Sequence, residues 1–333
     1  MLFRVFYIFI SSFFLAGCLS EYREHYIREH ALLETHVSSG TFVPRESFAI
    51  LPDRKALTDL VSSIDGAEKR IWIEIYTWTE KSTLDAVIRA HHRWVDVRVI
   101  LEWSVYGTPW INNDTQKILK SENIPVVFAD NTRYTFTHAK IWLIDGIWCL
   151  STGNWSYSTF TKNREFIACN DDPSLRANIE EIFLADSAYE LPYFSGGLDN
   201  RLGVSPLNMR SWLTENISLA KKSLYIYNQS LSDIGIIDLL ESLKQSWVDV
   251  KVCTNSIPWT WALRDATFSI RNLKKPYLHA KLVMIDEEKI LLWSINFTEN
   301  AVDRNREIAL LVKKNEIFYS QVKNLFFTEC FPD

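Results

Sequence analysis

The two halves of this chain resemble one another. Residues 64–75 (IDGAEKRIWIEI) align with residues 217–228 (ISLAKKSLYIYN), and WVDVRV at 94–99 aligns with WVDVKV at 247–252, an offset of 153 residues. The tripeptide His-Ala-Lys stands at 138–140 and again at 279–281, an offset of 141, so the first copy carries 12 more residues between these landmarks. Such self-similarity predicts two similar folding units in one chain.

Each copy shows the same order of apolar patterns. A helix that buries one face is predicted before the first strand by the spacing of Leu57, Leu60, Val61 and Ile64. In the first copy, strands are predicted at 71–77, 96–101, 147–151 and 165–169, a helix near 83–93, and a strand at the His-Ala-Lys segment. Alternating helices and strands predict an α/β fold, with two similar α-β-α layered repeats and mixed sheets.

Boundaries between these units follow from composition. Repeat 1 is expected at 46–191 and repeat 2 at 207–333. The segment 192–206 contains three glycines and begins and ends with proline, so it is predicted to be the linker.

The N-terminus reads as an export signal. Arg4 is the only charged residue before Glu21, and a short apolar run follows it, so residues 1–17 are predicted to be a signal peptide. The tetrad Leu-Ala-Gly-Cys ending at Cys18 resembles a bacterial lipoprotein signal, which implies a lipid on Cys18 and a stem at 18–45. Leu19 rather than Asp at the next position favours the outer membrane of a bacterial cell envelope. The alternative is an ordinary signal peptide or membrane anchor with an incidental cysteine.

Four further cysteines remain, namely Cys149, Cys169, Cys253 and Cys330. Export makes disulfides possible. Because the first three lie in apolar strand-like runs and no CxxC pair exists, buried free thiols are predicted instead. No metal-ligand spacing is present, so no metal and no cofactor are expected.

A longer polar pattern extends from each His-Ala-Lys. The first copy contains His138, Lys140, Asp145, Thr152, Asn154, Asn163 and Glu165. The second copy contains His279, Lys281, Asp286, Ser294, Asn296, Asn305 and Glu307. The interval from the first asparagine to the glutamate is 11 residues in both copies, which is hard to attribute to chance.

These residue types suit phosphoryl chemistry. Side chains two apart on a strand share a face, so each histidine lies beside its lysine. The imidazole can attack phosphorus or move a proton, and the ammonium can hold the non-bridging oxygens. Asn154 and Asn296 are expected to donate further hydrogen bonds to these oxygens. Glu165 and Glu307 are expected to fix a histidine tautomer.

The aspartates are predicted to have a structural role. Asp145 follows His138 by seven residues and Asp286 follows His279 by seven. An odd spacing on a regular strand turns a side chain to the opposite face, away from the histidine.

The full pattern, H-x-K-x4-D, then Ser/Thr-x-Asn, then Asn-x-Glu, resembles the phospholipase D superfamily. The resemblance implies two repeats about a pseudo-twofold axis with one active site at their interface. It also implies a phospho-histidine intermediate, with His138 favoured as nucleophile and His279 as acid and base, and with two lysines in place of a metal. Ser151 and Trp293 depart from the glycine that the family usually carries before the Ser/Thr.

The substrate class is less constrained. A net charge of -5 argues against a general polyanion binder. The expected anchor and aromatic residues near the motifs favour a phospholipid hydrolase or phosphatidyl transferase at a membrane surface, expected as a monomer. These aromatic residues are Trp103, Tyr106, Trp110, Trp155, Trp259 and Trp261. A nuclease is the alternative, because 264–281 holds Arg264, Arg271, Lys274, Lys275 and Lys281 against one acid. A non-catalytic surface lipoprotein is a second alternative, although no motif residue is missing.

Overall fold

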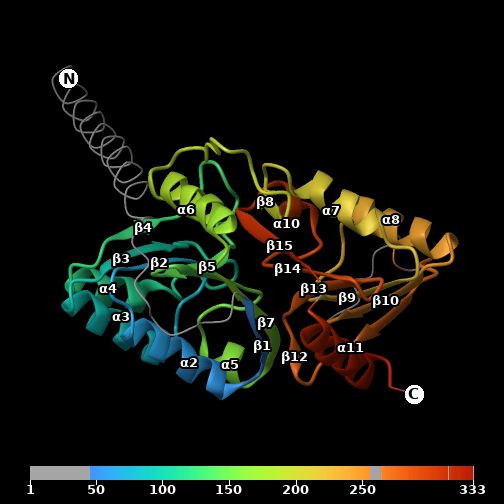
Figure 1. Cartoon of the computed structure of the whole chain (residues 1–333), viewed down its shortest axis with the longest axis horizontal. Coiled ribbons are helices and arrows are strands. Elements are labelled where there is room, and N and C mark those ends of the chain that lie inside the picture. The colour runs from blue at the N-terminus through green and yellow to red at the C-terminus, as the bar shows by residue number, and fades with distance from the viewer. Residues whose placement is uncertain (1–45, 256–262, 264, 314, 333) are drawn as a thin grey trace.

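The computed structural model describes residues 46–255, 263, 265–313 and 315–332. Two mixed β-sheets lie side by side, one for each repeat (Figure 1). The predictions at Cys18, in the signal and stem, and at Trp259, Trp261 and Arg264 lie outside the described residues.

The first sheet has the order β1-β7-β6-β5-β2-β3-β4, and β12 of the second repeat pairs with β7. Strands β2, β3 and β4 are parallel, and the pairs from β2 to β1 are antiparallel. The strands are β1 (Glu46–Leu51), β2 (Arg70–Ile75), β3 (Asp96–Leu101), β4 (Val126–Phe128), β5 (Lys140–Ile144), β6 (Ile147–Ser151), β7 (Asn163–Asn170) and β12 (Tyr277–Leu278).

The second sheet repeats this plan in the order β11-β10-β9-β13-β14-β15-β8. Its strands are β8 (Leu202–Ser205), β9 (Ser223–Asn228), β10 (Asp249–Thr254), β11 (Ser269–Asn272), β13 (Lys281–Ile285), β14 (Lys289–Trp293) and β15 (Glu307–Lys313). β8 takes the place that β1 has in the first sheet. This edge strand lies within 192–206, where the sequence suggested only a linker.

Helices cover both faces of each sheet, which gives the α-β-α layers that the sequence predicted (Figure 1). In the first repeat they are α2 (Arg54–Asp65), α3 (Lys81–His92), α4 (Asn113–Ser121), α5 (Tyr157–Thr161) and α6 (Pro173–Ser187). In the second repeat they are α7 (Met209–Ser218), α8 (Ile234–Gln245), α10 (Glu299–Asp303) and α11 (Glu316–Cys330). The caps are also repeated, because Ser156 caps α5 and Thr298 caps α10 with side-chain oxygens.

One apolar core joins the repeats. α6 contributes Ile179 and Phe183, α11 contributes Val322 and Phe326, and side chains from both sheets pack with them in one buried cluster. Separate clusters lie under α2 and α3 and under α7 and α8. The shared core makes the two repeats a single packed body.

The segments before the two histidines cross between repeats. The N–H of His138 donates to the Arg306 carbonyl at 2.9 Å, and the N–H of His279 donates to the Arg164 carbonyl at 3.4 Å. This reciprocal exchange is the pseudo-twofold relation expected from the sequence. The strand predicted at His-Ala-Lys begins only at Lys140, so His138 lies just ahead of it.

The prediction of free thiols is wrong. Cys149 and Cys169 form a disulfide between β6 and β7, where they are directly opposite one another with Cα atoms 4.0 Å apart. Cys253 and Cys330 form a second disulfide that ties β10 to α11. Strand pairing and helix packing bring together cysteines that lie 20 and 77 residues apart, so the absence of a CxxC pair was no guide.

Candidate active site

His138 is buried and His279 is partly buried at the boundary between repeats, and each contacts a glutamate of the other repeat. Nδ1 of His138 lies 2.9 Å from Oε1 of Glu307, and Nδ1 of His279 lies 2.6 Å from Oε1 of Glu165. With Nδ1–H donated to a carboxylate, Nε2 of His138 is left for a substrate, while Nε2 of His279 lies 3.2 Å from the Lys281 amine. The structure therefore joins the two half-sites through crossed pairs.

The glutamates are themselves held in place. Thr152 Oγ1 donates to Glu165 at 2.6 Å and Asn163 Nδ2 donates to it at 3.3 Å. In the second half, Glu307 accepts from Ser294 Oγ and from Asn305 Nδ2. The hydroxyl and amide residues of the motif thus orient the carboxylates rather than contact the histidines.

The two lysines are completely buried beside their histidines. Nζ of Lys281 lies 3.2 Å from Nε2 of His279, and Nζ of Lys140 donates to the His138 carbonyl. Burial lowers the pKa of Lys281 to about 8, and burial lowers that of Lys140 well below its ordinary value. A bound phosphate anion would raise both lysine pKa values again, because a nearby opposite charge favours the ammonium form.

The pKa values of both histidines are lowered by burial. Burial lowers the pKa of His138 to about 4, although the Glu307 charge opposes this. Burial also lowers the pKa of His279, and Glu165 opposes it in the same way. Burial alone would raise the pKa of Glu165, but His279 and Lys281 lower it below the ordinary value. A neutral imidazole at His138 is the form that a nucleophile requires.

Asn154 and Asn296 are partly buried, and their Oδ1 atoms have no hydrogen-bond partner among the described residues. These oxygens are therefore not committed to holding the framework. Gly153 lies between Thr152 and Asn154, where an added Cβ would come within 2.7 Å of the Glu165 carboxyl carbon. Only glycine permits this close approach beside the catalytic carboxylate.

The aspartates hold the framework. Asp145 accepts backbone N–H bonds from residues 68, 69 and 70 at 3.1, 2.8 and 3.0 Å. Asp286 accepts the equivalent three bonds from residues 221–223. Each carboxylate thus fixes the start of a central strand, β2 or β9. Trp293, the departure from the family pattern, is buried in the core under α7 and α8 and packs on Phe297.

Sequence reasoning missed the arginine between each Asn and Glu. Arg306 is buried and pairs with Asp186 of α6, its Nε lying 2.8 Å from Oδ2, and it also contacts the Tyr134 hydroxyl. Arg164 pairs in the same way with Glu329 of α11. Each arginine therefore anchors the strand that carries a site glutamate to a helix of the shared core. The identical Asn-Arg-Glu in both copies was the available signal.

Tyr76 was missed as well. Its ring lies edge-on to His138, with centroids 4.6 Å apart, and the Lys140 ammonium is 5.2 Å from the ring centroid. Burial raises the pKa of Tyr76 to about 12. The first half-site is therefore bordered by a neutral phenol.

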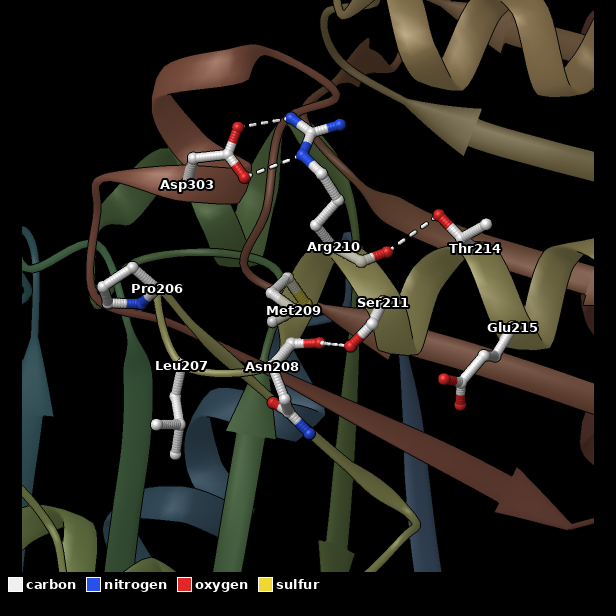
Figure 2. Close-up of a pocket in the computed structure, with 9 residues that line it drawn as sticks. All are labelled: Pro206, Leu207, Asn208, Met209, Arg210, Ser211, Thr214, Glu215 and Asp303. Carbon is white, nitrogen blue, oxygen red and sulfur yellow. Dashed lines mark hydrogen bonds and ion pairs between the residues drawn. The ribbon is translucent and has the colours of Figure 1, made fainter.

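A separate surface hollow of about 510 Å³ lies at the start of α7 (Figure 2). Its one arginine, Arg210, is already paired with Asp303 and Asp233, and the hollow contains none of the motif residues. We assign it no role. Within the described ranges, no group of three His, Cys, Asp or Glu side chains is placed to hold a metal ion.

The family described as cardiolipin synthase, PLD-like domain, matches residues 60–187 and 213–328, which is most of the chain and covers both motifs. The chain belongs to the phospholipase D superfamily. The resemblance seen in the sequence is thus confirmed for both repeats of this phospholipase D-like chain.

Relatives and solved structures agree with this assignment. The chain is 23% identical over 145 residues to a phospholipase D of Rickettsia typhi, covering 41% of this chain and 71% of that protein. Its fold is similar to phosphatidylserine synthase of Haemophilus influenzae Rd KW20, with a TM-score of 0.67, 14% identity and 86% of each chain covered. Polyphosphate kinase of Porphyromonas gingivalis also has a TM-score of 0.67, with 16% identity, over 84% of this chain and 49% of that one.

Proposed function

We propose that this protein hydrolyses phospholipids or transfers their phosphatidyl groups through a phospho-histidine intermediate. The observation that carries the proposal is the pair of crossed His–Glu contacts, at 2.9 and 2.6 Å, with two buried lysines beside them. Two imidazoles oriented through Nδ1 by carboxylates, with a lysine beside each, suit in-line displacement at a phosphodiester.

In this mechanism the lone pair of His138 Nε2 forms a bond to phosphorus while the bond from phosphorus to the leaving oxygen breaks. Protonated His279 gives its Nε2 proton to that oxygen, and the alcohol departs. Neutral His279 then takes a proton from water or a second alcohol, which attacks phosphorus and releases His138. Lys140 and Lys281 hold the non-bridging oxygens, and Asn154 and Asn296 donate to them. Burial lowers the pKa of His138 to about 4, which keeps its imidazole in the neutral form that attacks phosphorus.

The test offers the purified protein a panel of phospholipids and, in parallel, single-stranded DNA, each with and without a chelator. Release of headgroup alcohol that persists with chelator supports the proposal. Adding glycerol as acceptor separates transfer from hydrolysis, because transfer produces a new phospholipid. A chelator that abolishes turnover, restored by a divalent ion, would overturn the lysine-based mechanism.

A nuclease is the second candidate. Arg271, Lys274 and Lys275 are exposed near β11 and β12, beside the segment that carries His279. Such cations attract a nucleic-acid backbone, but they also attract anionic lipid headgroups. Cleavage of DNA without any phospholipid turnover would favour the nuclease.

We also propose that Cys18 carries lipid and anchors the protein in a bacterial cell envelope, toward the outer membrane. The support is the lipoprotein-like tetrad and the two disulfides, which persist in oxidising compartments. Within the described residues no helix is long and apolar enough to cross a membrane. Mass spectrometry of the mature N-terminus tests the anchor, and an unmodified N-terminus at another residue would contradict it.

A further inference from the structure

The side chains that border the two histidines differ between the repeats, and aligning the repeats identifies the corresponding positions. At the offset of 153, Tyr76 corresponds to Gln229, and at the offset of 141, Phe136 corresponds to Tyr277. Tyr106 lies in the additional residues of the first copy. The histidines, lysines and glutamates are the same in both halves, so these positions are among those where the half-sites differ.

On the first-repeat side, aromatic rings run in series from the histidine to the surface. Ring centroids are 4.6 Å apart from His138 to Tyr76, 6.0 Å from Tyr76 to Phe136, and 6.3 Å from Phe136 to Tyr106. Tyr106 is 83% exposed. We name Tyr76, Phe136 and Tyr106 the aromatic wall, and it leads from the reacting centre to solvent.

The loop that carries Tyr106 is firmly anchored. The backbone N–H of Tyr106 donates to the Tyr76 hydroxyl at 2.7 Å. At the base of the loop, buried Asn112 donates to the carbonyls of Tyr76 and Glu102, at 2.9 and 2.7 Å, and the Glu102 carboxylate accepts the N–H of Thr137 at 2.9 Å. A large ring left exposed on an anchored loop beside a catalytic histidine presents an apolar surface to a ligand.

Among the described residues, the positions of the second repeat that correspond to Tyr76 and Phe136 carry polar groups. Gln229 Nε2 donates to the Tyr277 hydroxyl at 3.2 Å, in place of the ring contact between Tyr76 and Phe136. Among the described residues, the ring contacts include none to His279. We name Gln229 and Tyr277 the polar wall, and exposed Lys274 and Lys275 precede Tyr277 in the chain.

We infer that these walls orient the substrate, with the acyl-glycerol portion of a phospholipid along the aromatic wall and the headgroup along the polar wall. This inference rests on the proposed function. In an in-line displacement by His138, the leaving alcohol departs on the side opposite the nucleophile, toward His279 and the polar wall. The phosphatidyl group stays on His138, beside the aromatic wall.

The experiment compares kcat/KM for a long-chain phospholipid in mixed micelles with kcat/KM for the glycerophosphodiester that has the same headgroup and no acyl chains. Tyr106→Ser should lower the ratio of the two values by about tenfold, the loss expected when roughly 50 Å² of apolar contact disappears. The substitution keeps the backbone N–H that bonds Tyr76, and the exposed position makes a folding defect easy to exclude by the unchanged unfolding midpoint.

Trp94→Ser is the matched control. Trp94 is 95% exposed but lies at the opposite end of β3 from the Tyr106 loop, so the ratio should stay at the wild-type value. Tyr277→Phe provides the reciprocal test, because it should change the preference between headgroups and not the dependence on acyl chains. Phospholipid turnover with an unchanged ratio in Tyr106→Ser would overturn this inference alone. Absence of any phospholipid turnover by the wild-type protein would overturn the proposed function, and this inference with it.

Discussion

The Glu165 carboxylate lies 2.6 Å from Nδ1 of His279, and the two residues belong to different repeats. The reciprocal pair, Glu307 and His138, is 2.9 Å apart. Each half-site is therefore completed by the other half. Because Arg164 and Arg306 anchor the strands of these glutamates to α11 and α6, packing of the shared core controls the geometry of both pairs.

The first prediction concerns cooperation between the histidines. His138→Ala and His279→Ala should each reduce kcat by about 10⁴-fold or more, because one removes the nucleophile and the other its proton partner. The double variant should be little worse than either single variant, since the residues act as one unit. Steady-state kinetics measures all three. If each single variant kept about half of the activity, the chain would instead hold two independent sites.

A second prediction follows from the crossed pairs. Glu165→Gln should impair His279, a residue of the other repeat, and lower kcat by about 10²–10⁴-fold. The Glu165 charge opposes the effect of burial on the pKa of His279, so its removal should lower that pKa further. The protonated acid is then lost at a lower pH, and the alkaline limb of the kcat profile should move toward acid. Thr152→Val is the control, because it removes the hydroxyl that bonds Glu165 and the Phe166 N–H but leaves the carboxylate charge in place. An alkaline limb that stays in place would contradict the pairing.

The candidate site residues could be chosen from the sequence because they are repeated at matched spacing. His138, Lys140 and Glu165 could be selected because His279, Lys281 and Glu307 stand in the same order. The fold class followed from the same repeat, together with the alternation of helices and strands, and it is confirmed.

The contacts between the two repeats could not be predicted from the spacing of the motif residues. Nothing in the spacing shows that Glu165 contacts His279 rather than His138, since the choice depends on how the two sheets pack. The disulfide partners of Cys149 and Cys253 depend in the same way on strand register and on the position of α11. Tyr76 was not predicted as a site residue because it lies outside the motif, and only its contact with His138 in the structure identifies it.

A third prediction concerns pH and stability. The pKa of His138 is about 4 in the folded protein, against an ordinary value of 6.5. Between these values the unfolded chain binds a proton at this residue and the folded protein does not. The contribution of His138 is therefore fully present above pH 6.5 and is lost as pH falls toward 4, by on the order of 3 kcal/mol in total.

Urea unfolding at several pH values across this window measures the effect, and NMR titration of the imidazole measures the pKa directly. A site histidine that titrates near its ordinary value would contradict the prediction.

A fourth prediction ranks the disulfides. Cys253 and Cys330 are 77 residues apart and Cys149 and Cys169 are 20 apart, so the first pair restricts the unfolded chain more. Cys330→Ser should cost about 4 kcal/mol of unfolding free energy and Cys169→Ser about 3 kcal/mol. Reductant should destabilise the wild-type protein more than either variant. Equal unfolding midpoints with and without reductant would show that the thiols are free.

The last prediction separates framework from chemistry at Asp145. This carboxylate accepts three backbone N–H bonds at the start of β2, and its own φ is 51°, in the left-handed region. Asparagine tolerates that conformation, so Asp145→Asn changes the acceptor and leaves the backbone preference nearly unaltered. The carboxylate accepts the three N–H bonds with two oxygens, whereas the asparagine amide has only one oxygen acceptor. The expected loss is about 1–3 kcal/mol of unfolding free energy.

Activity should behave differently from stability in this variant. The Asp145 carboxylate accepts backbone N–H bonds near β2 rather than bonding His138, so kcat per folded molecule should stay within about twofold of wild type at a temperature well below the unfolding midpoint. Asp286→Asn is the matched variant in the second repeat, where the same three bonds form and φ is 53°. The two variants should lose similar stability, because the two sites are alike. If Asp145→Asn instead abolished turnover while remaining folded, and Asp286→Asn did not, then Asp145 would have a part in the reaction that its position in this structure does not explain.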